Sequence, residues 1–307
     1  MFEVLGQMAA LVACGMGWRA FRPLGLAADT TRSVLTGLVY VLLLPALVLQ
    51  VLWRTPLGLD SLRIAALGSG TMVGALLLTW WVCRLARVKR PTAGALVLAV
   101  AFPNVLYLGL PVLEATFGNW SRGVAVQIDL FAMEPVLFTL GVAAAQAHGH
   151  GGDGIHPVAA LAKVPPLWAG LLGALLNVTG VAMPHWIQGL LGMLASGVIP
   201  LMLLSLGLSL SWSQVHRDNL PLVIPAVIAR LLLIPLGAWY LSGPLGLAGS
   251  ERVAAVLETA MPSMVLGLML CDRYRLNTGL YAMTVTLSTV FSLVTLPLWL
   301  DWLGHGR

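Results

Sequence analysis

The sequence predicts an all-α polytopic membrane protein, and three observations lead to that prediction. First, 59% of the 307 residues are hydrophobic and only 9% are charged, whereas a soluble domain carries about 25% charged residues. Second, apolar stretches of the length that crosses a bilayer as a helix recur along the whole chain. Third, two of these stretches contain a proline near their midpoint. The net charge of +5 includes no basic run interleaved with aromatic residues, which argues against a nucleic-acid partner.

Ten segments are apolar and long enough to be spanning helices. A short polar, glycine-rich connection, AHGHGGDGIHP, separates the fifth segment from the sixth and divides the chain into halves 1–150 and 151–307. The expected spans are 2–18, 34–53, 62–83, 92–117, 123–146, 158–182, 186–211, 219–243, 250–271 and 278–300.

The distribution of Lys and Arg predicts the orientation of these helices. With the N-terminus outside, the inner loops hold 11 of the 17 Lys and Arg residues and the outer side holds 5, while Arg230 lies within a span. Because basic loops tend to stay in the cytoplasm, both termini are expected on the outer, periplasmic side of the cell membrane. Five spans per half then force the second half to enter with opposite polarity, as in an inverted repeat.

Two sequence matches between the halves support an inverted repeat of five helices. LLLPALVLQ around Pro45 matches GVIPLMLLS around Pro200, and FPN at Pro103 matches MPS at Pro262. The two pairs of prolines are separated by 155 and 159 positions, so equivalent helices are interrupted at nearly equivalent places.

The breaks in the fourth and ninth spans are candidate binding sites. A proline in a helix interior costs about 3 kcal/mol, and the bilayer has no water to satisfy freed backbone groups. A break at Pro103 and at Pro262 leaves half-helix ends near the bilayer centre, and half-helix N-termini attract anions. Asn104 and Ser263 follow the two prolines and add polar side chains. The alternative is a plain proline kink in each helix.

The segment FPNVLYLGLPVLEATFG resembles the fourth-helix signature of the auxin efflux carrier family. The matching positions are Pro103, Asn104, Gly109, Pro111, Leu113 and Gly118. Val105 stands where the family has threonine. The resemblance continues through PPLWAGLLGALLNVTGVAMP, VIPLMLLSLGLSL, IARLLLIPLGA and ETAMPSMVLGLMLCDRY, in the family's order. The short central connection is similar to that of bacterial members, whereas the related plant carriers have a long hydrophilic loop.

This resemblance implies a fold similar to that of the sodium/bile-acid symporters. Helices 1, 2, 6 and 7, about 2–53 and 158–211, would form a scaffold through which a homodimer is expected. Helices 3–5 and 8–10, about 62–146 and 219–300, would form a moving transport domain in an elevator mechanism. Helices 4 and 9 would cross at their prolines, with Pro103, Asn104 and Pro262 at the crossover and Asn104 contacting the carboxylate of the substrate. Family substrates are organic anions of the auxin and malonate kind.

Ionisable and polar residues inside the spans are further candidates, because such residues rarely face lipid. Gln127, Asp129 and Glu134 lie in the fifth span. Gln127 and Glu134 are two turns apart and are expected to share a helix face, while Asp129 points toward another helix. Arg230 lies in the eighth span, and Glu258 lies one turn before Pro262. The two interpretations are an Arg230–carboxylate pair that fixes helix packing and a proton or cation site beside the crossover.

The sequence predicts no cofactor and no metal site. His148, His150 and His156 lie in the glycine-rich connection and are interpreted as a solvated linker. The three cysteines, Cys14, Cys83 and Cys271, have no metal-binding or redox spacing and are interpreted as small hydrophobic residues. The third span lacks an acid, so the proton-accepting aspartate of some plant carriers has no counterpart there.

The function expected from these features is secondary transport of a small carboxylate by alternating access. The chain has no G-x-x-x-x-G-K-[ST] loop, which argues against direct ATP drive. It has no H-E-x-x-H or G-x-G-D motif, so an enzyme is not expected. A sodium-coupled symporter of bile-acid-like anions and a channel or sensor on the same fold are the alternatives, and the coupling ion is left open between proton and sodium.

Overall fold

The computed structural model describes residues 2–150, 161–210 and 212–305. Within these ranges every regular element is helical, and the extended backbone contributes one isolated bridge, between Pro103 and Ser263. This is the architecture expected of an all-helical polytopic protein. His156 and the start of the expected sixth span at 158 lie outside the described residues, as does position 211 at the end of the expected seventh span.

The helices follow the apolar segments of the sequence. The first half contains α1 (Phe2–Phe21), α2 (Ala28–Leu38), α3 (Leu44–Leu52), α4 (Leu59–Leu85), α5 (Arg90–Ala101), α6 (Leu110–Phe117), α7 (Arg122–Ile128), α8 (Glu134–Val136) and α9 (Val142–His148). The second half contains α11 (Pro165–Val178), α12 (His185–Ser196), α13 (Val198–Ser209), α14 (Leu220–Ile228), α15 (Ile234–Ser242), α16 (Gly249–Thr259), α17 (Gly267–Arg273) and α18 (Thr278–His305).

Several of these helices are joined end to end by π-helical turns, and most of these turns precede a proline. The turns Val39–Leu43, Val105–Gly109, Asp129–Met133 and Ala229–Leu233 are each followed by a helix with proline at its start. A proline ring clashes with the carbonyl of the preceding turn, and a wider turn relieves that clash. A further π-helical turn, Leu137–Gly141, has no proline after it. The helices therefore continue through their prolines at these places.

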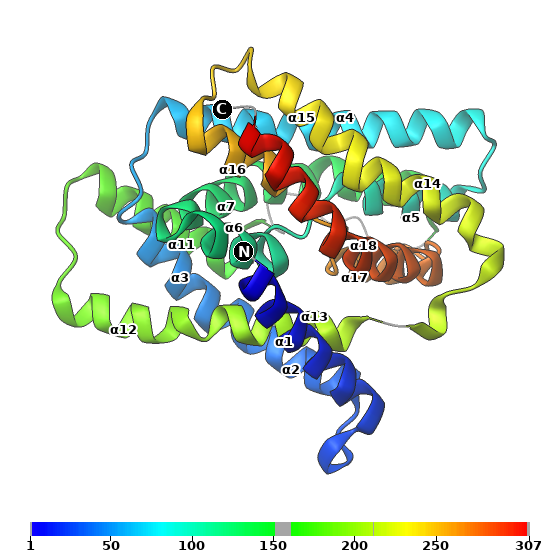
Figure 1. The fold of residues 1–307 in the computed structure, drawn as a ribbon, viewed down its shortest axis with the longest axis horizontal. Coiled ribbons are helices and arrows are strands. Elements are labelled where there is room, and N and C mark those ends of the chain that lie inside the picture. The colour runs from blue at the N-terminus through cyan, green and yellow to red at the C-terminus, as the bar shows by residue number, and fades with distance from the viewer. Residues whose placement is uncertain (1, 151–160, 211, 306–307) are drawn as a thin grey trace. The chain divides into compact units, whose positions relative to one another are not determined.

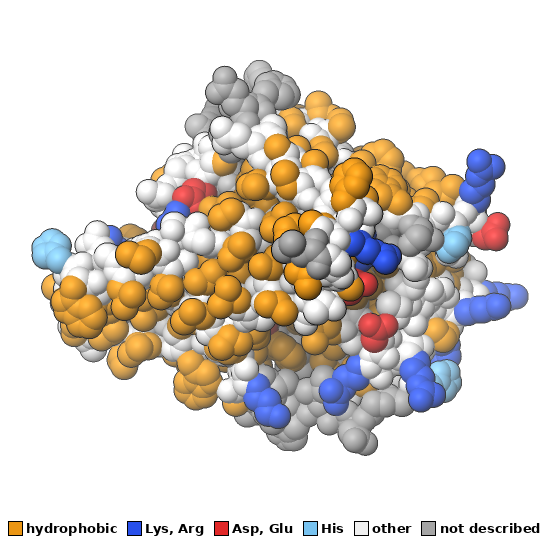
Figure 2. All heavy atoms as spheres, turned by 90° about the horizontal axis from the view of Figure 1, so that it is seen from below, with side chains coloured by type: hydrophobic (Ala, Val, Ile, Leu, Met, Phe, Trp, Pro, Cys, Tyr) orange, Lys and Arg blue, Asp and Glu red, His pale blue; other side chains and the backbone are white. Residues whose placement is uncertain are grey.

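Six helices are long and apolar enough to cross a membrane among the residues that the structure describes. They are Ala28–Leu52, Leu59–Leu85, Asn119–His148, His185–Ser209, Arg217–Ser242 and Thr278–Gly304. Three shorter apolar helices are Arg90–Ala101, Val105–Phe117 and Pro165–Val178. Hydrophobic side chains make up much of the surface in view in Figure 2. Large exposed ones in the protein include Trp186 and Met193. An apolar surface over buried polar groups is the pattern of a multi-pass membrane protein.

The chain folds into two compact units, and the first consists of Met1–Ser61, Leu106–Val126 and Leu161–Leu210. In this unit α1 packs along α13, and α3 packs against α11 and α12 (Figure 1). Close approach of α1 and α13 depends on Gly15 and Gly207, because a Cβ built at Gly15 would lie 2.9 Å from the Cα of Gly207. Small residues at such contacts are typical of membrane helix pairs.

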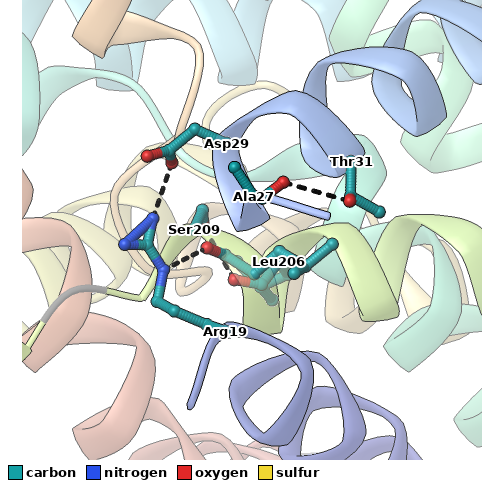
Figure 3. A network of polar contacts seen from close by, with 7 residues as sticks. Arg19, Ala27, Asp29, Thr31, Leu206 and Ser209 are labelled. Atoms are coloured by element: carbon teal, nitrogen blue, oxygen red, sulfur yellow. Dashed lines mark hydrogen bonds and ion pairs between the residues drawn. The ribbon is translucent and has the colours of Figure 1, made fainter. Parts of the chain in front are cut away.

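Polar contacts at one end of the first unit tie α1, α2 and α13 together (Figure 3). Arg19 donates from Nε to the carbonyl oxygen of Leu208 at 2.8 Å and pairs through Nη2 with Asp29 at 2.7 Å. Leu208 lies in the last turn of α13, where carbonyls lack helical partners and carry partial negative charge. Arg19 therefore caps one helix while it holds the start of another.

The second unit consists of Leu62–Val105, Gln127–Ala160 and Ser211–Arg307. Its centre is α5, which packs against α9, α14 and α18. All nine residues of α5 from Ala93 to Ala101 are buried. Helix α18 also packs against α14, α16 and α17 (Figure 1). This unit contains both breaks, at Pro103 and Pro262, and every candidate site residue named from the sequence.

Candidate functional site: two interrupted helices

The fourth and ninth apolar segments leave the helical conformation at their prolines and pair with each other. Helix α5 ends at Ala101, and α16 ends at Thr259. The backbone N–H of Asn104 donates to the carbonyl of Pro262 at 2.8 Å, and that of Met264 donates to Phe102 at 3.0 Å. These two hydrogen bonds form the antiparallel bridge between Pro103 and Ser263. The freed backbone groups of each break are thus partly satisfied by the other break.

Proline suits this arrangement for local reasons. The residue before a proline is driven out of the helical region, and Phe102 is extended, with φ −102° and ψ 114°. In an antiparallel pairing, directly opposed residues alternate between pairs that share hydrogen bonds and pairs that do not. Pro103 and Ser263 are a pair of the second kind, since the hydrogen bonds join their neighbours. Pro103 therefore occupies a position where its missing N–H costs nothing.

The register of the pairing differs by one residue from the match made on sequence. The sequence match aligned Pro103 with Pro262, whereas the bridge sets Pro103 opposite Ser263, 160 positions away. The two hydrogen bonds are equivalent. In each, the residue after the bridge position on one segment donates its N–H to the carbonyl of the residue before the bridge position on the other, Asn104 to Pro262 and Met264 to Phe102. The backbone pairing, not the alignment of prolines, sets the local two-fold relation.

Unpaired polar atoms are buried at the bridge. Asn104 is 2% exposed and Ser263 is fully buried. Neither the Nδ2 of Asn104 nor the Oγ of Ser263 has a hydrogen-bond partner among the described residues. Buried polar side chains without partners are costly and uncommon, so each needs an explanation. Pro103 and Pro262 are also buried.

Two of the groups that hold the bridge were not identified from the sequence. Ser288 accepts a hydrogen bond from the backbone N–H of Ser263 at 3.2 Å, and Tyr281 donates from its hydroxyl to the carbonyl of Met264 at 2.8 Å. Both belong to α18, which also buries Thr284, Thr289 and Ser292. The run TVTLSTVFS in an otherwise apolar span is the signal that could have identified Ser288, and Tyr281 lies three residues before it.

The acidic residues of the fifth and ninth segments lie near one another. Asp129, Glu134 and Glu258 are 1%, 6% and 0% exposed. The charge of Asp129 interacts with those of both Glu134 and Glu258. Each of the three has at least one carboxylate oxygen without a hydrogen-bond partner in the described part of the chain. Gln127, 3% exposed, likewise has an unpartnered Oε1.

A π-helical turn explains why Asp129 and Glu134 interact. The spacing of an α-helix predicts that Gln127 and Glu134 share one helix face and that Asp129 points toward another helix. The turn Asp129–Met133 is π-helical, and its wider spacing brings residues five apart into register. The charge of Asp129 also interacts with that of Glu258 in the ninth segment.

Arg230 has backbone carbonyls as partners rather than a carboxylate. It is 1% exposed. Its Nε donates to Met261 O at 3.0 Å, its Nη1 donates to Val100 O at 2.9 Å and Ala101 O at 3.3 Å, and its Nη2 contacts Thr259 O. The ion pairs described in this structure do not include Arg230. An Arg230–carboxylate pair is one of the two interpretations of the sequence; the hydrogen bonds of Arg230 among the described residues go to main-chain oxygens.

The histidines and cysteines considered in the sequence are not among the residues named above. His148 forms a hydrogen bond within its own helix, to Ala144 O at 2.8 Å. Cys83 and Cys271 are buried free thiols and Cys14 is an exposed one. In the described ranges, no group of three or more His, Cys, Asp or Glu side chains is arranged to hold a metal ion.

Comparison with known proteins shows the family. The model of the family described as membrane transport protein matches residues 4–139 and 158–300. The chain is 31% identical to an uncharacterized transporter of Methanothermobacter thermautotrophicus, over 95% of each chain. It is 32% identical to an uncharacterized transporter of Methanocaldococcus jannaschii over 69% of each chain, and 22% identical to the uncharacterized transporter YfdV of Escherichia coli K12 over 78% of this chain and 77% of that protein.

The chain therefore belongs to this family of membrane transport proteins. The resemblance to auxin efflux carriers drawn from the sequence is confirmed. Together with its apolar helices, this membership makes the protein a multi-pass membrane protein whose partners are the lipid bilayer and a small transported molecule.

Proposed function

We propose that this protein is a secondary transporter of a small organic anion, a carboxylate of the auxin-like or malonate-like kind. The observation that carries the proposal is the pair of interrupted helices whose bridge buries Asn104 and Ser263, each with a polar side-chain atom that has no hydrogen-bond partner among the residues described. Irregular backbone inside a membrane is tolerated where it lines a cavity or is packed in protein. In carriers with interrupted helices, such breaks form the substrate site.

The chemistry of the fourth segment favours an anion. Asn104 directly precedes the helix that resumes at Val105 and runs to Phe117. The first backbone N–H groups of a helix carry partial positive charge and lack helical acceptors. An amide donor beside them suits a carboxylate oxygen, and Ser263 and Gln127 offer further hydrogen bonds. Pro103, Asn104, Pro262, Ser263, Gln127 and Asp129 are the proposed substrate-binding residues.

An elevator mechanism accounts for the organisation of the chain. In this proposal 2–53 and 158–211 form a fixed scaffold, through which two copies associate, and 62–146 and 219–300 carry the substrate. The division into two compact units supports it, because every proposed site residue belongs to the second unit. Within 62–146, however, residues 106–126 group with the first unit. The two-fold pattern of the bridge supports the ten-helix inverted repeat, with both termini outside the cell membrane.

Proton coupling is the proposed energy source. Asp129, Glu134 and Glu258 are buried, and each has a carboxylate oxygen without a hydrogen-bond partner in the described ranges. An isolated buried charge is costly. A neutralising cation is therefore needed as these residues cross the membrane interior. A proton fits better than a metal, because these acids are not arranged as a metal-holding group in the described chain. Coupling to sodium is the rival outcome.

A substrate screen followed by one substitution tests the proposal. Purified protein is heated with a panel of organic acids, with and without sodium and at several pH values. A ligand raises the melting temperature by mass action. The acid that stabilises the protein is then used in uptake assays with proteoliposomes. We expect Asn104→Ala to reduce uptake about tenfold or more, the cost of losing a hydrogen bond to a charged group.

Asn119→Ala is the matched control, because Asn119 is exposed and starts a turn after α6. It should transport as the wild type does. Normal uptake by a folded Asn104→Ala variant would remove Asn104 from the site. Single-channel current steps would show a pore instead of a carrier, and stabilisation that requires sodium would favour a sodium-coupled symporter.

A further inference from the structure

Arg230 connects the ends of both interrupted helices. It lies in the π-helical turn Ala229–Leu233, between α14 and α15. Two of its acceptors, Val100 O and Ala101 O, are the last carbonyls of α5. The other two, Thr259 O and Met261 O, lie at and just beyond the end of α16. The acceptors are about 130 and 30 positions away in the chain, so only the tertiary fold brings them together.

These carbonyls form a negative site inside the protein. The last carbonyls of a helix have no helical partner, and the end of the helix carries about half a negative charge. Two such ends converge on one guanidinium here. Among the described residues, the ion pairs do not include Arg230, and the charge of Asp129 interacts with those of Glu134 and Glu258. The positive charge of Arg230 is matched by the two helix ends.

The guanidinium holds a position that a dissolved cation would otherwise fill. In carriers built on interrupted helices, half-helix C-terminal ends and unwound carbonyls coordinate the coupling cation. The planar guanidinium presents five N–H donors in a fixed geometry and is always charged. It therefore satisfies several carbonyls at once without leaving the site.

We propose that Arg230 is the built-in cation of the bridge between the two interrupted helices, so that this position binds no dissolved metal ion. Arg230 is thus a positioning residue that holds Phe102–Asn104 against Pro262–Met264. One cation serves both halves: the position 160 residues before it is Gly70, and residues 64–82 contain no charged side chain. A metal ion that couples transport would have to bind elsewhere.

The relevance of this inference to transport rests on the proposed function, but its test needs no substrate. Hydrogen–deuterium exchange is measured in detergent or nanodiscs on peptides that contain Asn104 and Met264, whose amides form the bridge. We expect Arg230→Ala to speed exchange there by about tenfold or more, because several hydrogen bonds to a charged group are lost. Millimolar guanidinium, far below denaturing concentrations, should restore slow exchange in a saturable way.

Arg252→Ala is the matched control. Arg252 lies on α16, one of the two interrupted helices, and donates to Ser242 Oγ at 2.8 Å and Trp239 O at 3.1 Å, not to the carbonyls that Arg230 contacts. Its removal should leave bridge exchange unchanged, and guanidinium should have no effect on it. In the wild type, replacing sodium with choline in the buffer should also leave the rate of hydrogen–deuterium exchange at the bridge unchanged.

Three results would overturn the proposal: wild-type exchange in a folded Arg230→Ala variant, the absence of guanidinium rescue, or sodium-dependent protection of the wild-type bridge. If Arg230→Ala does not fold, Arg230→Lys and Arg230→Met replace it, since they have similar length and differ in charge. Faster exchange in the Met variant than in the Lys variant supports a cation, and equal exchange overturns it. A failed organic-acid screen would overturn the proposed substrate class without changing these outcomes.

Discussion

Glu258 illustrates how buried charge connects structure to transport at the scale of one residue. It is fully buried in the last turn of α16, and neither carboxylate oxygen has a hydrogen-bond partner among the described residues. The carboxylate of Asp129 is close enough for the two charges to repel each other. Such a group contributes little to stability when charged, because desolvation outweighs any attraction. Its role is better explained by function.

Replacement of Glu258 by glutamine tests this role. The amide keeps the shape and removes both the charge and the exchangeable proton. We expect Glu258→Gln to unfold no more easily than the wild type, within about 1 kcal/mol, because the substitution removes an unpaired acid and no ion pair. Proton-driven accumulation of the substrate in proteoliposomes should fall by about tenfold or more if the acid is the proton carrier.

Glu251→Gln is the control, since Glu251 is exposed in the first turn of the same helix. It should leave both stability and transport unchanged. If Glu258→Gln accumulates substrate with the pH dependence of the wild type, Glu258 does not carry the proton.

At the scale of elements, glycine and proline shape the helices in different ways. Pro45, Pro111, Pro135 and Pro235 are each accommodated by a π-helical turn, and the chain remains helical. At Pro103 the helix stops instead, because a second extended segment is there to receive its hydrogen bonds. A proline thus predicts an irregularity in the helix. Whether the helix widens into a π-helical turn or ends depends on whether a neighbouring segment can form hydrogen bonds with the freed backbone groups.

Two glycines of α1 provide a matched pair for a packing test. Gly15 faces α13 so closely that an added Cβ would meet Leu204 O and lie 2.8 Å from Leu208 N, whereas a Cβ at Gly17 would meet nothing within 4 Å. We expect Gly15→Ala to destabilise the protein by about 1–3 kcal/mol through overpacking. Gly17→Ala should be neutral or stabilise by up to about 1 kcal/mol, because alanine favours a helix.

The measurement is thermal or denaturant unfolding of both variants in the same detergent. Equal stability of the two variants would contradict the close contact of α1 with α13.

At the scale of the whole molecule, large apolar side chains are exposed while several polar and charged side chains are buried within a mostly apolar interior. Exposed tryptophans and leucines cover the helices that the lipid would contact, while Asn104, Asp129 and Arg230 are buried. In a soluble protein, residues such as Asp and Arg are almost never fully buried unless they are paired. The bilayer therefore provides an apolar environment for the exposed side chains, in addition to the apolar interior, and polar groups gather where helices break.

The orientation of the molecule is tested with reporter fusions in a bacterial host. Lys and Arg are concentrated in the loops that we assign to the cytoplasm, which predicts that both termini face outward. Alkaline phosphatase fused after Arg307 should be active, and a green fluorescent protein at the same place should be dark. The fluorescent protein inserted in the connection after His148 should be bright, since that connection is assigned to the inside. The opposite pattern would invert the topology.

Much of the fold could be predicted from the sequence because the relevant signals are local. A run of apolar residues predicts a membrane helix wherever it occurs, and Pro103 and Pro262 locate the two interruptions from within their own segments. Burial of Asn104, Asp129, Glu134 and Glu258 follows from the same logic, because a polar residue in a span avoids lipid. The candidate site residues were identified for this reason.

Only the tertiary structure decided how these segments meet. The opposition of Pro103 and Ser263, the approach of Asp129 to Glu258, and the carbonyl partners of Arg230 all join residues far apart in the chain. Their register depends on hydrogen bonds between two backbones, which no side-chain pattern specifies. The π-helical turns likewise shift side chains away from the spacing of an α-helix. The sequence determined that the helices break and which polar residues are buried there, and the packing of distant segments determined what each of those residues contacts.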